Sequence, residues 1–296
     1  MLSRVFRQSF STDVSKSVKI RELGPRDGLQ NEKKILPASL KIEFIDKLSD
    51  AGLDYIEVSS YVNPKLVPQM ADSSQIFKSI ARRAGVTYAA LVPNEKHLMK
   101  AIEDNIGEVC VFVSASEGFS RKNINCSIKD SLEKTEKVIK LAKKHGLPIR
   151  GYVSCAFHCP LEGSVRPQSV INVASKLVEF GCKEISIADT IGSACKDDVK
   201  RLLDELTPKI SSKLLAMHFH DSKNQAISNV LLSARDYDIR IFDSCIKGLG
   251  GCPFAGPGVP GNVETESLLK ELIKNGYEIN SRIDIMKLEE VRLNFV

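Results

Sequence analysis

Short apolar runs alternate with longer amphipathic segments from residue 18 onward. Val, Ile and Phe dominate the short runs, and several are almost continuously hydrophobic, which is typical of strands buried on both faces. We therefore predict strands at Val18–Leu23, Asp54–Val58, Val86–Val92, Glu108–Ser114, Pro148–Ser154, Glu184–Ala188, Leu214–His220 and Arg240–Ser244.

The segments between these runs have helical spacing. The apolar residues of Pro37–Ala51 largely share one helical face, and Ser127–His145 begins with a residue that can cap a helix. Gly52, Gly146 and Gly181 stand where a left-handed residue commonly ends a helix. The remaining predicted helices are Gln168–Phe180, Lys196–Leu206 and Lys223–Ala234.

This alternation predicts an α/β fold, a single (β/α)8 TIM barrel with its active site at the C-terminal ends of the strands. A doubly wound open sheet would also alternate strands and helices, but the absence of a Gly-x-Gly-x-x-Gly turn favours the closed barrel. The length of 296 residues suits one barrel domain, for which roughly 250 residues are usual. We assign residues 18–296 to that domain.

Residues 1–17 have the composition of a mitochondrial transit peptide. The first twelve residues, MLSRVFRQSFST, contain no acid, and Arg4 and Arg7 fall one helical turn apart beside apolar residues. The alternative is a frayed terminus with this composition by chance. We expect the protein in the mitochondrial matrix.

Overall composition narrows the class of protein only a little. The hydrophobic content of 43% and charged content of 27% are ordinary for a soluble globular domain. No apolar run approaches the ~20 residues of a membrane-spanning helix, so we expect no membrane partner. The net charge of +5 arises from Lys and Arg interspersed with acids, which indicates no nucleic-acid partner and weakly favours an anionic ligand.

The eight cysteines are expected to be free thiols rather than a disulfide framework. We predict that Cys110, Cys182 and Cys195 are small buried residues, because each lies in or beside an apolar run. Cys155 and Cys159, with His158 between them, have no second ligand pair, so we interpret them as packing residues rather than as a zinc site.

Candidate metal ligands gather at the predicted strand ends. His218 and His220 are two apart on a strand, so both imidazoles can face one ion. Asp27 can add an anionic oxygen and Asn262 a neutral one, whereas Asp221 should face away. Mixed nitrogen and oxygen ligands leave positions for a chelating substrate and favour Mg²⁺ or Mn²⁺ over structural zinc.

Two further residues could act on a substrate. Arg26 could stabilise an oxyanion, could form an ion pair with Glu57, or could do both if Glu57 orients it. Cys252 lies in the glycine-rich segment Gly248–Gly261 that follows the last predicted strand. This segment is either a flexible connection or a moving loop that delivers a thiol for proton transfer.

Several sequence motifs together resemble the 3-hydroxy-3-methylglutaryl-CoA lyase family from Val18 to about Val296. The motifs are GPRDGLQNE from Gly24, VPQM from Val67, KNINCS from Lys122, RGYVSCA from Arg150, DTIG from Asp189 and GLGGCP from Gly248. The last is the most specific of these signatures.

The resemblance implies a role for each matching position. Asp27, His218, His220 and Asn262 would bind the metal, Cys252 would be the catalytic thiol, and Arg26 would face the thioester oxygen. Glu57 and Asp189 would support the site. The positions expected near the acyl group are Gln30, Ser60 and Ser186.

The implied reaction is cleavage of (S)-3-hydroxy-3-methylglutaryl-CoA into acetoacetate and acetyl-CoA, a step of ketone-body formation and leucine degradation. Asp27 or His218 would remove the proton of the C3 hydroxyl, the C2–C3 bond would break in a retro-Claisen sense, and Cys252 would supply the final proton. An acyl-CoA is the implied partner, and we expect a homodimer.

Two other functions remain open at this point. Related barrel synthases share Arg26-Asp27-Gly28 and the paired histidines, and condense acetyl-CoA with a 2-oxo acid, but they typically have Glu in place of Leu29. A binding protein without turnover is the other alternative. It is suggested by departures from the family pattern at Ala188, Lys223 and Lys247.

Overall fold

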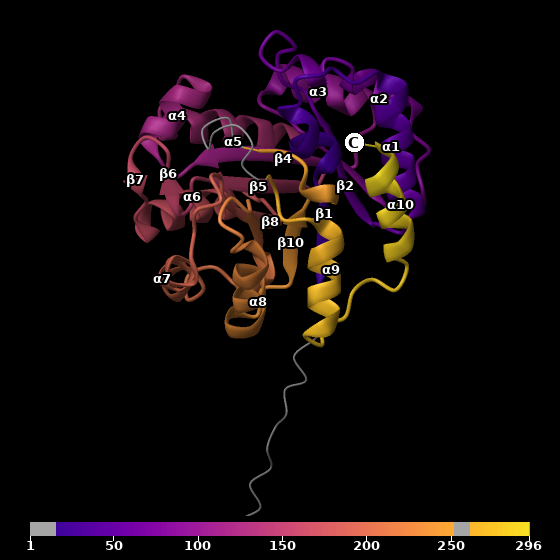
Figure 1. Cartoon of the computed structure of the whole chain (residues 1–296). Helices are drawn as coiled ribbons and strands as arrows, with labels where there is room; N and C mark the ends of the chain where they lie inside the picture. Colours follow the sequence, from indigo (N-terminus) through magenta and orange to yellow (C-terminus); the bar gives the residue numbers. More distant parts are fainter. Residues whose placement is uncertain (1–15, 252–260, 296) are drawn as a thin grey trace, which may run out of the picture.

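A computed structural model describes residues 16–251 and 261–295. Eight parallel strands in this part of the chain form a closed barrel, in the spatial order β1-β10-β9-β8-β5-β4-β3-β2 (Figure 1). These strands are β1 (Lys19–Glu22), β2 (Tyr55–Ser60), β3 (Thr87–Leu91), β4 (Glu108–Ser114), β5 (Ile149–Ser154), β8 (Glu184–Asp189), β9 (Leu215–Phe219) and β10 (Ile241–Ser244). The predicted TIM barrel is confirmed.

Helices cover the outside of the barrel (Figure 1). They are α1 (Ala38–Asp50), α2 (Ser73–Ser79), α3 (Glu95–Glu103), α4 (Glu117–Ile124), α5 (Ile128–Lys144), α6 (Pro167–Phe180), α7 (Lys196–Leu206), α8 (Ala226–Tyr237), α9 (Thr265–Lys274) and α10 (Ile285–Phe295). Shorter elements connect them: η1 (Gly24–Gly28), η2 (Pro68–Met70), η3 (Ser212–Leu214), η4 (Ile246–Gly248) and the hairpin of β6 (His158–Cys159) with β7 (Gly163–Ser164). Among the described helices, none is long and apolar enough to cross a bilayer.

One helix begins later than predicted. We expected a helix over Lys223–Ala234, but α8 starts at Ala226. Asn224 has a left-handed backbone with a φ of 55°, which a helix interior does not accommodate. The carboxylate of Asp221 accepts the backbone N–H of Ala226 at 2.8 Å, so Asp221 helps to start this helix.

The cysteine predictions are partly confirmed. Cys110 and Cys182 are buried, but Cys195 is exposed, so that prediction was wrong. Cys195 is the N-cap of α7, where the chain has left the barrel wall, and its thiol contacts the carboxylate of Asp198. The packing interpretation holds for the other pair, since Cys155 and Cys159 are buried.

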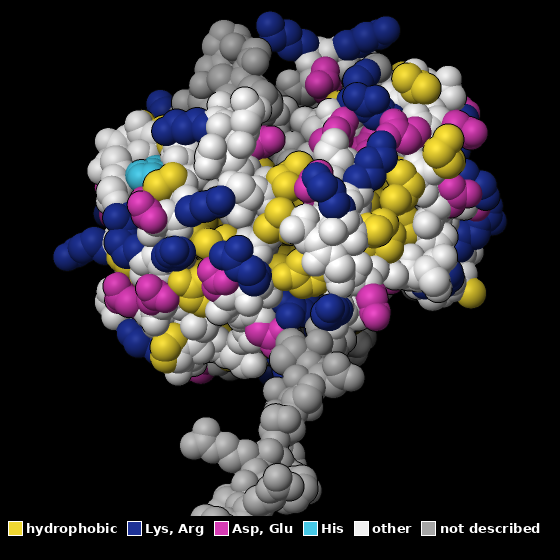
Figure 2. All heavy atoms as spheres, turned by 60° about the horizontal axis from the view of Figure 1, so that its bottom comes forward, with side chains coloured by type: hydrophobic (Ala, Val, Ile, Leu, Met, Phe, Trp, Pro, Cys, Tyr) yellow, Lys and Arg dark blue, Asp and Glu magenta, His cyan; other side chains and the backbone are white. Residues whose placement is uncertain are grey.

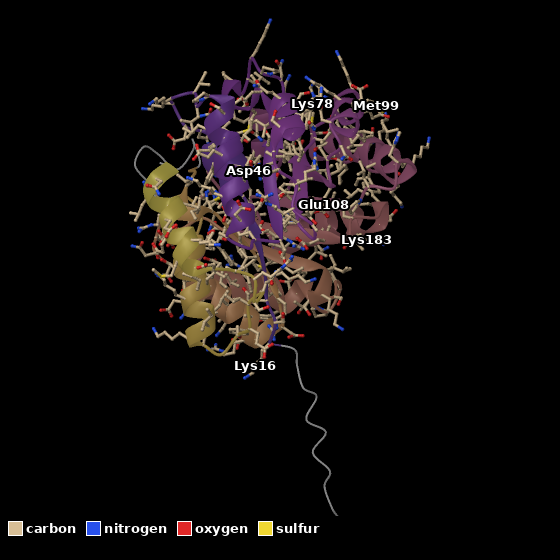
Figure 3. All side chains as sticks on the ribbon, turned by 90° about the vertical axis from the view of Figure 1, so that its right-hand side faces the viewer. Lys16, Asp46, Lys78, Met99, Glu108 and Lys183 are labelled. Carbon is tan, nitrogen blue, oxygen red and sulfur yellow. The ribbon has the colours of Figure 1, made fainter. Side chains whose placement is uncertain are left out.

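The parallel arrangement fixes which residues share an end of the barrel. Glu108 begins β4 and Lys183 directly precedes β8, and Figure 3 shows both on the same side of the molecule. Both strands pair with β5 in parallel, so their starting residues lie at the N-terminal end and their last residues at the opposite mouth. On the face in Figure 2, basic, acidic and apolar side chains are interspersed, so neither charge dominates that surface.

The interior of the barrel is charged as well as apolar. Arg150, on β5, is completely buried and lies 2.5 Å from the carboxylates of both Glu184 and Asp243. Arg21, on β1, also forms an ion pair with Glu184 at 2.7 Å. Because a buried charge is costly unless it is paired, these residues hold one another in fixed positions below the mouth.

Candidate active site

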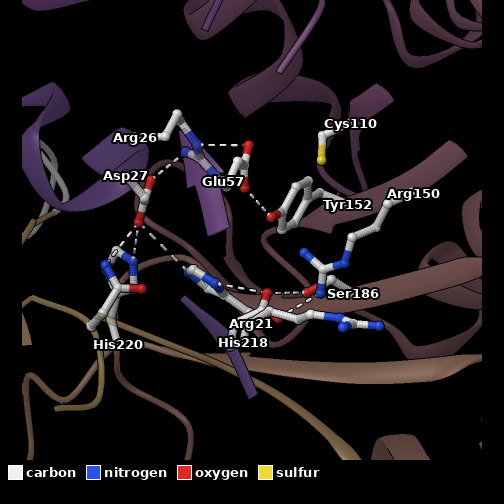
Figure 4. Close-up of polar contacts among 12 residues, drawn as sticks. Arg21, Arg26, Asp27, Glu57, Cys110, Arg150, Tyr152, Ser186, His218 and His220 are labelled. Carbon is white, nitrogen blue, oxygen red and sulfur yellow. Dashed lines mark hydrogen bonds and ion pairs between the residues drawn. The ribbon is translucent and has the colours of Figure 1, made fainter. Parts of the chain in front are cut away.

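Three of the four predicted metal ligands meet at the barrel mouth. Asp27 lies in η1, His218 on β9 and His220 directly after that strand. Their candidate ligand atoms all lie within 4.8 Å of one another, and this is the one such cluster among the described residues. The Asp27 Oδ2 atom is 4.0 Å from Nε2 of His218 and 3.6 Å from Nε2 of His220. Figure 4 shows both rings directed at this carboxylate.

Asn262 completes the predicted set. It forms an antiparallel bridge with His220, so the segment after the glycine-rich loop runs beside the end of β9. Its Nδ2 donates to Asp27 Oδ2 at 2.8 Å, while its Oδ1 is buried and has no hydrogen-bond partner in the described structure. An unpaired buried carbonyl oxygen beside a carboxylate and two imidazoles fits a divalent cation with mixed nitrogen and oxygen ligands.

Local structure places Asp27 where the ligands meet. Glu22, at the end of β1, accepts the backbone N–H groups of Gly24 and Ile246 at 2.8 and 2.9 Å. Its other oxygen accepts the hydroxyl of Thr265 at 2.6 Å. One buried carboxylate therefore joins the base of η1 to the chain that follows β10, and a Cβ added at Gly24 would lie only 2.6 Å from it.

This arrangement predicts a specific dependence of stability on pH. Burial raises the pKa of Glu22 to about 7, against three hydrogen bonds that lower it. The stabilisation from neutral Glu22 is therefore fully present below its ordinary pKa of 4.5 and is lost as the pH rises through about 7.

We expect Glu22→Gln, which stays neutral, to reduce the loss of unfolding free energy across this range by about 3 kcal/mol. Urea denaturation of both proteins at a series of pH values measures the effect. Burial also raises the pKa of Glu266 to about 7. The free energy of unfolding of both proteins therefore keeps some dependence on pH in this range. Parallel pH profiles for the two proteins would contradict the assignment to Glu22.

Arg26 is held on both sides by carboxylates. Its Nε and Nη2 donate to Glu57 at 2.9 and 3.1 Å, and its Nη1 donates to Asp27 at 2.5 Å. Burial works against the charged guanidinium, but Glu57 and then Asp27 outweigh it and raise the pKa of Arg26 well above its usual value. The expected ion pair with Glu57 is present, and it fixes the plane of the Arg26 guanidinium.

The charge on Asp27 is stabilised in return. Burial favours its neutral form, but Arg26, ahead of His220 and His218, holds the pKa of Asp27 well below its ordinary value. Tyr152 donates its hydroxyl to Glu57 at 2.5 Å and carries Arg26 over its ring at 5.5 Å from the centroid. The result is a fixed positive group beside an anionic ligand.

A cavity of about 190 Å³ opens above these groups. Arg26, Asp27, Gln30, His218 and His220 line it, as predicted. Leu91, Phe112 and Phe119 supply apolar surface that the sequence analysis did not identify. Two polar wall residues, Asn123 and Tyr152, were also missed, although both belong to motifs that the chain shares with the lyase family.

Three of the residues predicted to lie around the substrate are not part of the cavity wall. Ser60 is buried and contacts the carbonyl oxygen of Leu91, and Ser186 is buried and donates to Asp243 at 2.8 Å. Asp189 accepts the backbone N–H groups of the two residues that begin at Ser193, at 3.2 and 2.9 Å. A part for these three in substrate binding stays a prediction.

Cys252 lies outside the described residues. Gly251, the last described residue before it, lines the cavity. Asn31 donates to the carbonyl oxygen of Gly251 at 2.6 Å, which ties the start of the glycine-rich segment to the chain that follows η1.

Comparison with known proteins identifies close relatives. The chain is 48% identical over 276 residues to the 3-hydroxy-3-isohexenylglutaryl-CoA/hydroxymethylglutaryl-CoA lyase of Pseudomonas aeruginosa, covering 93% of this chain and 91% of that protein. Other relatives include lyases described as cytoplasmic and as mitochondrial.

Solved structures of lyases have the same fold as this chain. A hydroxymethylglutaryl-CoA lyase from Pseudomonas aeruginosa superposes with a TM-score of 0.90 at 47% identity, over 95% of this chain and 93% of that one. An HMG-CoA lyase from Acinetobacter baumannii, in complex with coenzyme A and 3-methylmalate, gives a TM-score of 0.87 at 32% identity, over 94% and 89% of the two chains. The HMGL-like family model matches residues 17–295, and the chain belongs to this family.

Proposed function

We propose that this protein is a lyase that cleaves 3-hydroxy-3-methylglutaryl-CoA into acetoacetate and acetyl-CoA. The observation that carries the proposal is the meeting of Asp27, His218, His220 and Asn262 with Arg26 at the mouth of the barrel. The close relatives named as lyases of this substrate support it, and the complex of one such lyase with coenzyme A supports an acyl-CoA partner.

Asp27, His218, His220 and Asn262 would hold a divalent cation, for which we propose Mg²⁺ or Mn²⁺ because no thiolate is among the ligands. When bound, the cation supplies Lewis acidity toward the oxygens of a chelating substrate. The chain's own groups account for the rest of the reaction.

The reaction needs a base, a group that stabilises negative charge, and an acid. Asp27 would accept the proton of the C3 hydroxyl, or His218 would do so if its Nε2 did not bind the cation. As the C2–C3 bond breaks, its electron pair passes to the acetyl-CoA enolate, whose oxygen the fixed guanidinium of Arg26 would stabilise. Cys252 would then deliver a proton to the enolate carbon, which becomes the methyl group of acetyl-CoA.

The remaining assignments concern substrate contacts and context. Gln30 lines the cavity and would contact the acyl group, with Ser60, Ser186 and Asp189 placed around it. The composition of residues 1–17 supports a location in the mitochondrial matrix, where ketone-body formation and leucine degradation would use this reaction. We propose a homodimer as the assembly.

Metal removal gives the direct test of this function. Chelation of divalent cations is expected to abolish acetoacetate release from 3-hydroxy-3-methylglutaryl-CoA, and Mg²⁺ or Mn²⁺ should restore it. Acetoacetate and acetyl-CoA are measured in parallel, since the lyase must form them in equal amounts.

The same assay separates the alternatives. Free CoA that appears only after a 2-oxo acid is added to acetyl-CoA would indicate a synthase. Binding of the acyl-CoA without any product would indicate a protein that has kept the site but not the reaction.

A further inference from the structure

The side chain of Asp243 connects a predicted metal ligand to the charged interior of the barrel. Asp243 lies on β10 and is 1% exposed. Its Oδ2 atom is 3.2 Å from Nδ1 of His218 and accepts the hydroxyl of Ser186 at 2.8 Å. Its Oδ1 accepts from Arg150 at 2.5 Å. Figure 4 labels three partners of this carboxylate, His218, Ser186 and Arg150, which lie next to one another.

These contacts keep Asp243 an acceptor. Arg150 donates to its Oδ1 at 2.5 Å and Ser186 donates to its Oδ2 at 2.8 Å, so both carboxylate oxygens face donors. A carboxylate that is ion-paired with a guanidinium accepts hydrogen bonds, so the 3.2 Å contact with His218 places a ring proton on Nδ1. The other ring nitrogen, Nε2, then carries a lone pair and faces Asp27.

We propose that Asp243 is a positioning residue that holds His218 in the Nδ1–H tautomer, with Nε2 directed at the cation site. Arg150 and Ser186 fix the carboxylate, so the barrel interior sets the orientation of a ligand at the mouth. This inference rests on the cation site of the proposed function. Metal-binding histidines commonly donate their second ring nitrogen to such a carboxylate, and loss of that partner typically weakens metal affinity 10–100-fold.

The variant Asp243→Asn tests the inference. Its amide can accept from Arg150 and donate to Nδ1, which would move the ring proton to Nε2 and block ligation. We expect Mn²⁺ affinity, measured without substrate by electron paramagnetic resonance, to fall about 10–100-fold. Unchanged Mn²⁺ affinity would overturn the proposal.

A matched control is Asp104→Asn. Asp104 is 3% exposed and accepts from Tyr61 at 2.9 Å and Ser74 at 2.8 Å, but it lies at the end of α3, outside the cavity wall. This variant makes the same change of charge at a buried site and should bind Mn²⁺ as the unaltered protein does. Equal losses in both variants would show a general loss of structure and overturn the assignment to Asp243.

A second measurement requires no variant at Asp243. The ¹⁵N chemical shifts of the ring nitrogens in metal-free protein, at about pH 8.5 where histidine is ordinarily neutral, should show a protonated Nδ1 and an unprotonated Nε2 for His218. His218→Asn assigns the signals among the five histidines. A proton found on Nε2 would overturn the proposal. Because neither measurement uses the acyl-CoA, both remain valid if the proposed reaction is wrong.

Discussion

Asp27→Ala is expected to weaken Mn²⁺ binding more than about 100-fold and to reduce acetoacetate formation to background. Asp27 is the one carboxylate among the proposed ligands, and loss of a ligand should exceed the 10–100-fold effect typical of its hydrogen-bonded partners. The variant also removes one of the two carboxylates that hold Arg26, although Glu57 still binds that guanidinium at two points. Titration calorimetry with Mn²⁺ and an acetoacetate assay measure the two effects.

Asp221→Ala is the control for this variant. It removes the same charge one position after His220, and its structural role is to accept the first N–H of α8. We expect a loss of about 1 kcal/mol in the free energy of unfolding and little change in Mn²⁺ affinity. If Asp27→Ala bound Mn²⁺ as well as this control does, the cation site would have to be placed elsewhere.

Arg26→Lys is expected to lower kcat by about 100–1,000-fold, the effect of losing one well-placed donor to a developing oxyanion, or ~2.7–4 kcal/mol. The lysine keeps the positive charge but cannot bind Glu57 with two parallel hydrogen bonds, so its position is no longer fixed. Steady-state kinetics at saturating metal measure kcat and KM separately, and Mn²⁺ affinity should remain within a few-fold of the unaltered value.

Arg82→Lys is the matched control for Arg26→Lys. Arg82 donates to the carbonyl oxygens of Phe77 and Asp104 beside α2 and α3, outside the cavity wall, and should leave kcat unchanged. A drop in kcat equal for both variants, or an Arg26→Lys variant that changes only KM, would contradict the role assigned to the guanidinium.

Hydrophobic periodicity was sufficient to predict the barrel because its strands are buried on both faces. The predicted strand Asp54–Val58 became β2 at Tyr55–Ser60, and Arg240–Ser244 became β10 at Ile241–Ser244. Errors arose where a local hydrogen bond or an end position outweighed composition. The left-handed backbone of Asn224 delayed α8, and Cys195 faces solvent because it caps a helix.

The proposed metal ligands could be identified from the sequence because each ends a strand or follows one. The residues that hold them in place were not. Arg150 and Asp243 lie within strands, where a charged residue gives no sign of its partner across the barrel. The contact between Asp243 and His218 depends on strand register, which places the two residues opposite each other on neighbouring strands. Sequence spacing alone does not reveal which residues meet in this way.

The proposed cation ligands come from opposite ends of the polypeptide, with Asp27 after β1, His218 and His220 at the end of β9, and Asn262 after β10. They come together only when β1 pairs with β10 and joins the first strand of the barrel to the last. An intermediate that has folded several βα units but left this seam open therefore has no complete coordination sphere. During refolding, tight Mn²⁺ binding would therefore report when β1 pairs with β10. Circular dichroism would report the formation of helices separately.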